Sequence, residues 1–204
     1  MLCLDGVSKD EAVKTAEIAQ RCGINTFAVS LRSEFSGQTL NMLRAALGED
    51  AIIGADDVFC TDESDGDVEY ACQNGAKFVS SPICSNLLTD KARELDCVCI
   101  GGGETLKEIF DAHKKGSGFV RFSCAAGVSA ERIAEICDNI SYINLCVSGD
   151  IPMKTLNEYF DAGLSLYILR CEKISILAGQ QGWNELEEFI KEKASELKNC
   201  TKTI

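Results

Sequence analysis

The side chain in this sequence that most clearly points to binding or catalysis is Arg121, in the segment GFVRFSCAAG at residues 118–127. The pattern predicts a short buried strand over residues 118–122, followed by a turn of small residues. An arginine is almost never buried without a partner, because removing an unpaired charge from water is very unfavourable. We therefore expect Arg121 at the carboxyl end of a strand, where it binds either a ligand or an internal carboxylate.

Short apolar segments alternate with amphipathic ones along the whole chain, beginning with a capping box of Ser8 and Glu11 that starts the first helix. The expected strands are 1–4, 26–31, 51–54, 78–80, 97–100, 118–122, 142–146 and 166–169. The expected helices are 9–21, 36–47, 61–74, 85–95, 104–114, 128–138, 153–162 and 184–197.

Regular βα units predict a parallel sheet. Eight units without a Gly-x-Gly-x-x-Gly fingerprint after the first strand favour a (β/α)8 TIM barrel. We expect this α/β barrel to form a single domain over residues 1–200, with 201–204 as a tail.

Composition narrows the classes of partner. The formal charge of −12 disfavours binding to nucleic acid or to an anionic membrane surface, and favours small-molecule partners. Twelve cysteines accompany no signal peptide and no apolar run long enough to span a bilayer, so we expect a reduced, cytoplasmic protein. Cys97 and Cys99 are too close in sequence, and too far from the single His113, for a zinc site. No metal and no cofactor are expected.

In a TIM barrel the chemistry lies where the strands end, so these positions form the candidate site. These positions carry similar numbers of basic and acidic side chains. The segments concerned are 31–34, 54–57, 80–82, 101–105, 121–124, 148–150 and 170–173.

The order and spacing of three segments resemble one known family. GINTFAVSLRSE, AIIGADDV and NGAKFVSSP follow the strand, turn and glycine pattern of the 2-keto-3-deoxy-6-phosphogluconate and 4-hydroxy-2-oxoglutarate aldolases. The resemblance covers nearly the whole chain and is closest over residues 23–88. It implies a class I, Schiff-base aldolase on a small barrel that assembles as a homotrimer.

Two catalytic positions depart from that family. Its Schiff-base lysine falls on Arg121, whose guanidinium stays protonated and cannot supply a neutral amine nucleophile. Its acid/base glutamate falls on Ala28, which moves no proton. Two losses at matched spacing indicate that the ancestral mechanism has been abandoned.

The substrate-binding positions implied by the resemblance are mixed. Arg32 matches an arginine that contacts the substrate carboxylate, whereas Asp57 replaces a threonine that shares that task, and the charge of Asp57 would repel a carboxylate. Gly149 keeps one phosphate-loop glycine, but Asp150 replaces the next. Gly102, Thr105 and Glu108 keep their family places, whereas Arg170 and Cys171 replace a pair of glycines after the last strand. Pro82 is a further substrate-binding position. Replacing glycine blocks the close approach of backbone N–H groups to phosphate, and Asp150 adds repulsion.

Several interpretations of the charged residues remain open. Arg32 and Arg121 either clamp a carboxylate ligand or form internal ion pairs with Asp56, Asp57, Glu104 or Asp150. The similar numbers of opposite charges favour ion pairs.

Other reactive groups have weaker support. Asp57, Glu104 and Asp150 are candidate ligands for Mg²⁺ or Mn²⁺. Lys173 is a candidate substitute amine, and Cys124 a candidate nucleophile. We interpret His113 as a helix-end residue rather than a catalytic one.

These readings lead to one expected function and its alternatives. We expect an aldolase-family protein that has lost Schiff-base cleavage, with a small keto-acid or other small anion as its partner. The alternatives are a lyase that uses a metal or Lys173, a non-catalytic anion-binding or scaffold barrel, and a partner of an active paralogue.

Overall fold

The computed structural model describes residues 1–60, 66–122 and 127–200, with side chains up to residue 195. It forms a closed barrel of parallel strands in chain order, in which β1 pairs with both β2 and β8. The strands are β1 (Leu2–Leu4), β2 (Thr26–Ser30), β3 (Ile52–Asp56), β4 (Phe78–Ser81), β5 (Val98–Gly103), β6 (Phe119–Phe122), β7 (Leu145–Gly149) and β8 (Leu166–Leu169). The predicted (β/α)8 barrel is therefore confirmed.

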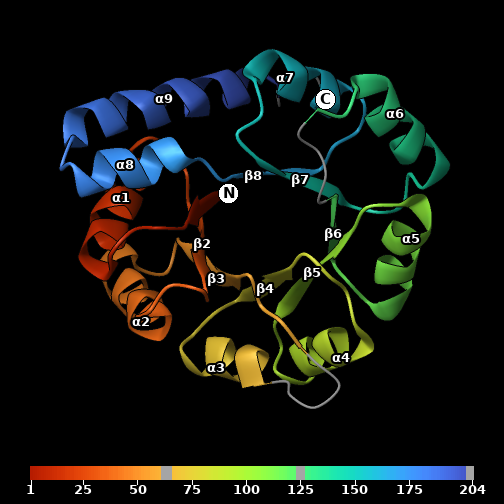
Figure 1. Ribbon diagram of the computed structural model, residues 1–204, viewed down its shortest axis with the longest axis horizontal. Coiled ribbons are helices and arrows are strands. Elements are labelled where there is room, and N and C mark those ends of the chain that lie inside the picture. Colours follow the sequence, from red (N-terminus) through yellow and green to blue (C-terminus); the bar gives the residue numbers. More distant parts are fainter. Residues whose placement is uncertain (61–65, 123–126, 201–204) are drawn as a thin grey trace.

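Helices surround the barrel, and Figure 1 looks into the ring that they form. They are α1 (Lys9–Arg21), α2 (Ser36–Leu47), α3 (Gly66–Gln73), α4 (Asn86–Glu94), α5 (Leu106–Lys115), α6 (Ala130–Asn139), α7 (Met153–Asp161), α8 (Glu172–Gly179) and α9 (Trp183–Cys200). The long α9 packs on α1, α7 and α8, as its apolar residues Leu186 and Ile190 require.

Local signals explain several of the element ends. The predicted capping box at α1 is present, with Ser8 and Glu11 each bonded to the backbone of the other. Thr105 and Glu108 form a second capping box at α5. The predicted bounds of α2 and β8 agree with the structure, and α8 was not predicted.

Three strands differ from their predicted bounds in ways that matter for the site. β3 continues beyond Gly54 to Asp56, and β5 includes the three glycines 101–103, which lie beyond the predicted strand 97–100. β7 begins at Leu145 rather than at the well-exposed Tyr142. The first five residues of the predicted helix 61–74, the tail 201–204 and Cys124 lie outside the described residues.

The inside of the barrel is built in layers, because alternate residues of each strand point inward. A middle apolar layer contains Cys3, Ala28, Phe78, Ile100, Cys146 and Ile168. Two residues further along the strands lies a polar layer that includes Ser30, Asp56, Ser80 and Arg121. The polar layer thus lies at the carboxyl end of the barrel, on top of apolar packing.

The described cysteines form no disulfide. Among the described helices, none is both long enough and apolar enough to cross a membrane.

The close approach of the backbone at Pro82 to β5 gives a testable consequence. A Cβ atom added to Gly102 would lie 2.8 Å from the Cα atom of Pro82, with backbone atoms of Pro82 closer still. We expect Gly102→Ala to lower the free energy of unfolding by about 1–3 kcal/mol, because the backbone of residue 82 must shift. Gly179→Ala is the matched control, since no atom lies within 4 Å of its added Cβ. It should leave stability unchanged or raise it by up to about 1 kcal/mol. Chemical denaturation measures both, and equal effects would contradict this account.

Candidate active site at the carboxyl end of the barrel

Arg121 on β6 forms a buried ion pair with Asp56 on β3. The Nη1 atom of Arg121 lies 2.8 Å from Oδ1 of Asp56 and also donates to Oγ of Ser80 at 3.3 Å. The two charged side chains are only 5% and 1% exposed, so neither charge is solvated by bulk water. The internal ion pair that the balanced charges favoured is therefore present at Arg121.

Asp56 has further partners that keep its carboxylate occupied. The thiol of Cys3 donates to Oδ2 of Asp56 at 3.6 Å, and Nη2 of Arg170 lies 3.8 Å from the same oxygen. Burial, reinforced by the charge of Asp56, raises the pKa of the Cys3 thiol well above its usual range. Cys3 is therefore a protonated hydrogen-bond donor here rather than a nucleophile.

A second pair lies beside the first, between Arg170 after β8 and Asp57 after β3. Both Nη atoms of Arg170 donate to Asp57, and Arg170 also lies 3.2 Å from Asp5. Ser30 donates to Asp57 at 2.7 Å. Burial alone would raise the pKa of Asp57, but these bonds from Arg170 and Ser30 outweigh it and lower that pKa. An ionised, hydrogen-bonded Asp57 is a poor general base.

The backbone at Asp57 has a φ of 56°, a left-handed conformation that aspartate tolerates better than most residues. This turn ends β3 and directs two consecutive aspartates toward different arginines, Arg121 and Arg170. The pairing therefore depends on where β3 stops.

Arg32 follows β2 and is the most accessible of these arginines, with 66% of its side chain exposed. Its Nη2 atom lies 3.8 Å from Oδ1 of Asp57, and its guanidinium lies over the ring of Phe59 at 5.7 Å. At that distance the pair with Asp57 is loose, because a good charge-assisted bond is about 2.7–2.9 Å long. Arg32 can exchange this contact for a ligand at low cost.

Hydrogen bonding in the cluster is incomplete. Within the described chain, the Nε atoms of both Arg121 and Arg170 are buried without a hydrogen-bond partner. A buried unsatisfied donor disfavours the folded state by about 1–3 kcal/mol. The cluster thus balances its charges without satisfying every donor.

Ala28 lies below this cluster, fully buried in the middle apolar layer. It is beside Cys3 on β1 and Gly54 on β3 in the sheet register. Among the described residues of that layer none carries a carboxylate or an amine side chain, so none of them replaces a carboxylate at this position.

The other predicted site residues lie around the same end of the barrel but in separate groups. Pro82 and Gly102 line a cavity of about 270 Å³ with Glu104 and Glu108. Thr105 caps α5 rather than facing the arginines. Gly149 accepts a hydrogen bond from the backbone N–H of Arg170 at 3.3 Å and has a φ of 133°.

The candidate metal ligands do not converge. Asp57 pairs with Arg170, whereas Asp150 receives the thiol hydrogen of Cys171 at 3.1 Å and lies 3.8 Å from Lys193. Glu104 is exposed beside α5. Among the described residues, no group of three or more acidic, histidine or cysteine side chains is placed to hold a metal ion.

The two remaining candidates also lie away from the arginines. The Nζ atom of Lys173 lies 4.4 Å from the ring of Phe189, so Lys173 packs on α9. His113 contacts the ring of Tyr142 edge-on at the end of α5.

Sequence reasoning missed three contributors to the cluster: Ser30, Asp5 and Cys3. Ser30 and Asp5 follow from strand periodicity, because Ser30 lies two residues beyond Ala28, and Asp5 two residues beyond Cys3, which itself faces inward. Extending the inward-facing positions by one step on each strand would have found them.

The buried pair yields a test of stability. Asp56→Asn leaves Arg121 as a buried unpaired charge, so we expect the free energy of unfolding to fall by about 3–5 kcal/mol. Replacing both partners, by Asp56→Leu with Arg121→Met, should recover most of that loss. As a control, Asp90→Asn removes the exposed pair with Arg93 and should change stability by less than about 1 kcal/mol. Urea denaturation measures all three, and an Asp56→Asn variant as stable as the control would contradict the pairing.

Comparison with known proteins assigns the chain to a family. The family model for KDPG and KHG aldolase matches residues 3–175. No curated protein sequence matches the chain.

The similar solved structures are barrels of low sequence identity. A KDPG aldolase from Legionella pneumophila, with pyruvate captured as a covalent carbinolamine, has a TM-score of 0.80 at 19% identity, covering 93% of this chain and 89% of that one. A 4-hydroxy-2-oxoglutarate aldolase from TTHB1 has a TM-score of 0.77 at 19% identity, with coverage of 96% and 92%. A 3-hexulose-6-phosphate synthase has a TM-score of 0.68 at 12% identity, with coverage of 83% and 88%. These likenesses show the shared fold, and the family match over most of the chain shows the descent: this protein belongs to the KDPG and KHG aldolase family.

Proposed function

We propose that this chain has lost Schiff-base aldol cleavage and instead binds a small keto-acid, or another small carboxylate, without turning it over. The observation that carries the proposal is the buried pair of Arg121 with Asp56. By the family resemblance, Arg121 occupies the place of the lysine that forms the imine with substrate.

Two chemical arguments support the loss of imine formation. A guanidinium has no free amine lone pair, so Arg121 cannot attack a carbonyl carbon. Its neighbour Asp56 is itself held by contacts with Arg121, Cys3 and Arg170. The residues that the structure describes around Ala28 in the middle layer are apolar.

The binding role rests on Arg32 and Arg170. Arg32 is well exposed and only loosely paired, and 28% of the Arg170 side chain is also exposed. Both contact Asp57 from neighbouring parts of the barrel end, so a small carboxylate can approach the pair from solvent. Asp57 repels a phosphate dianion more strongly than a carboxylate monoanion at this place, because the dianion carries more negative charge.

The two lyase alternatives have less support. Lys173 packs against Phe189 rather than reaching the arginine cluster. The candidate metal ligands Asp57, Glu104 and Asp150 have separate surroundings in the described chain.

The cytoplasmic location and the homotrimeric assembly remain expectations from the sequence and the resemblance. Light scattering after gel filtration measures the assembly.

Reductive trapping with pyruvate tests the loss of imine chemistry. Incubation with pyruvate and borohydride, followed by intact mass analysis, should give no pyruvyl adduct. An active family aldolase treated in parallel must give one. We also expect no adduct from Arg121→Lys, because Asp56 would hold the new ammonium group in its protonated form. An adduct on the unaltered protein would contradict the proposal, and peptide mapping would then identify the lysine, including Lys173.

Binding without turnover has its own test by isothermal titration calorimetry. Arg32→Gln should weaken pyruvate binding by about tenfold or more, because it removes a charge-assisted hydrogen bond. The control Arg132→Gln removes an exposed arginine on α6 that pairs with Glu135, and should leave pyruvate affinity unchanged. Equal affinity in all three proteins, or no heat of binding in the unaltered protein, would contradict the binding role.

A further inference from the structure

A large cavity opens at the opposite end of the barrel from the arginine cluster. Its volume is about 820 Å³, within the range of about 300–1,000 Å³ found for small-molecule sites. Its lining includes the first residue of six strands: Thr26, Ile52, Phe78, Val98, Phe119 and Leu166. The cavity therefore lies at the amino ends of the strands, below the middle apolar layer.

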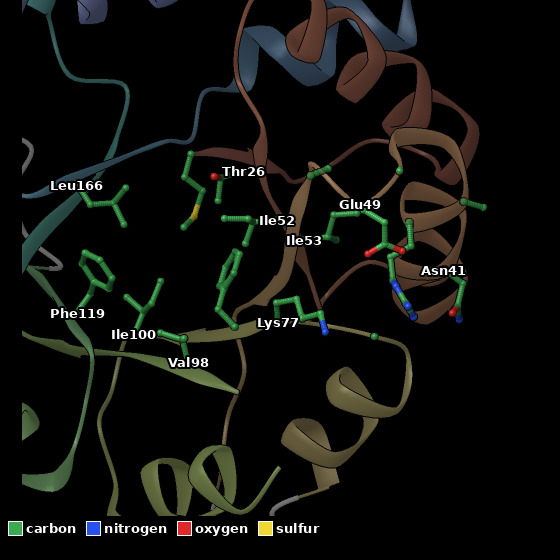
Figure 2. Close-up of a pocket in the computed structure, with 17 residues that line it drawn as sticks. Thr26, Asn41, Glu49, Ile52, Ile53, Lys77, Val98, Ile100, Phe119 and Leu166 are labelled. Carbon is green, nitrogen blue, oxygen red and sulfur yellow. The ribbon is translucent and has the colours of Figure 1, made fainter. Parts of the chain in front are cut away.

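The floor and one wall of this amino-end cavity are apolar. Ile100 and Phe78 belong to the buried middle layer, and Phe119 and Leu166 pack against it. Figure 2 shows Leu166, Phe119, Ile100 and Val98 grouped on one side of the opening. Ile52 and Val98 expose 52% and 48% of their surface at this end.

The opposite side of the cavity is polar and carries two cations. Lys77 precedes β4 and Arg44 belongs to α2, and both line the cavity. Figure 2 shows Lys77, Asn41 and Glu49 on the side away from Leu166 and Phe119. Within the part of the chain that the structure describes, neither Arg44 nor Lys77 forms a salt bridge. Glu49 is the one carboxylate among the lining residues.

Arg44 is also held in place by the backbone beside it. Gly75 lines the same cavity, and a Cβ atom added there would lie 2.6 Å from Cδ of Arg44. The missing side chain of Gly75 thus leaves the space in which the Arg44 side chain lies. This packing directs a cation along the polar rim.

An apolar wall facing two unbridged cations matches one class of ligand. We propose that the amino-end cavity binds an amphipathic carboxylate, with its hydrocarbon body on Phe119, Leu166 and Ile100 and its carboxylate near Arg44 and Lys77. Burial of the hydrocarbon supplies the affinity, and the cations select a negative head group over a neutral or positive one.

Titration calorimetry with decanoate, kept below its micelle concentration, tests the proposal on the intact chain. Decanoate should bind with one-to-one stoichiometry, whereas decan-1-ol should bind at least about tenfold more weakly and decyltrimethylammonium more weakly still. Arg44→Gln with Lys77→Gln should weaken decanoate binding by about tenfold or more without changing decan-1-ol binding. The matched control, Lys14→Gln with Lys154→Gln, removes two exposed charges on α1 and α7 and should leave decanoate affinity unchanged.

A second variant separates the cavity from the arginine cluster. Val98→Trp fills the apolar side of the opening and should abolish decanoate binding while circular dichroism reports an intact fold. Pyruvate should not compete with decanoate, since it is proposed to bind at the other end of the barrel. The proposal is overturned if decanoate fails to bind, if the alcohol binds as tightly as the acid, or if Val98→Trp leaves decanoate binding unchanged.

Discussion

The buried ion pair between Arg121 and Asp56 is the constraint on which the carboxyl end of this barrel depends. Each charge is almost fully removed from water, so each requires the other. The aspartate in turn attracts Arg170, whose second partner Asp57 lies near Arg32. Three arginines and the aspartates at positions 5, 56 and 57 therefore form one connected and balanced cluster where the family resemblance places an open catalytic pocket.

The layers of the barrel separate two kinds of chemistry. Charges gather at the carboxyl end, on top of an apolar layer that contains Ala28, Cys146 and Ile168. Below that layer the barrel opens again into a cavity with one apolar wall and a polar side opposite it. A ligand at one end has no polar route to the other. The proposed carboxylate binding at Arg32 and the proposed amphipathic ligand at the amino end can therefore be tested independently.

The barrel was predictable because its signals are local and repeated: apolar strands, capped helices and regular spacing. The bounds of β3 and β5 were less predictable, since Gly54 and the glycines 101–103 look like strand breakers. In the structure, Gly54 and Gly102 are needed because Phe78 and Pro82 approach too closely for a side chain. That error hid the inward orientation of Asp56, which sequence reasoning named only as one possible partner among four. Which side chains meet across the barrel depends on how the strands are aligned with one another, and no single segment of the sequence specifies that alignment.

A crystal structure of the protein grown with pyruvate tests the central claim most directly. The account predicts an intact pair of Arg121 with Asp56, and pyruvate held without a covalent bond beside Arg32 and Arg170. Electron density joining the pyruvate carbonyl carbon to a lysine nitrogen would contradict the account. So would an Arg121 side chain turned away from Asp56 to contact the ligand.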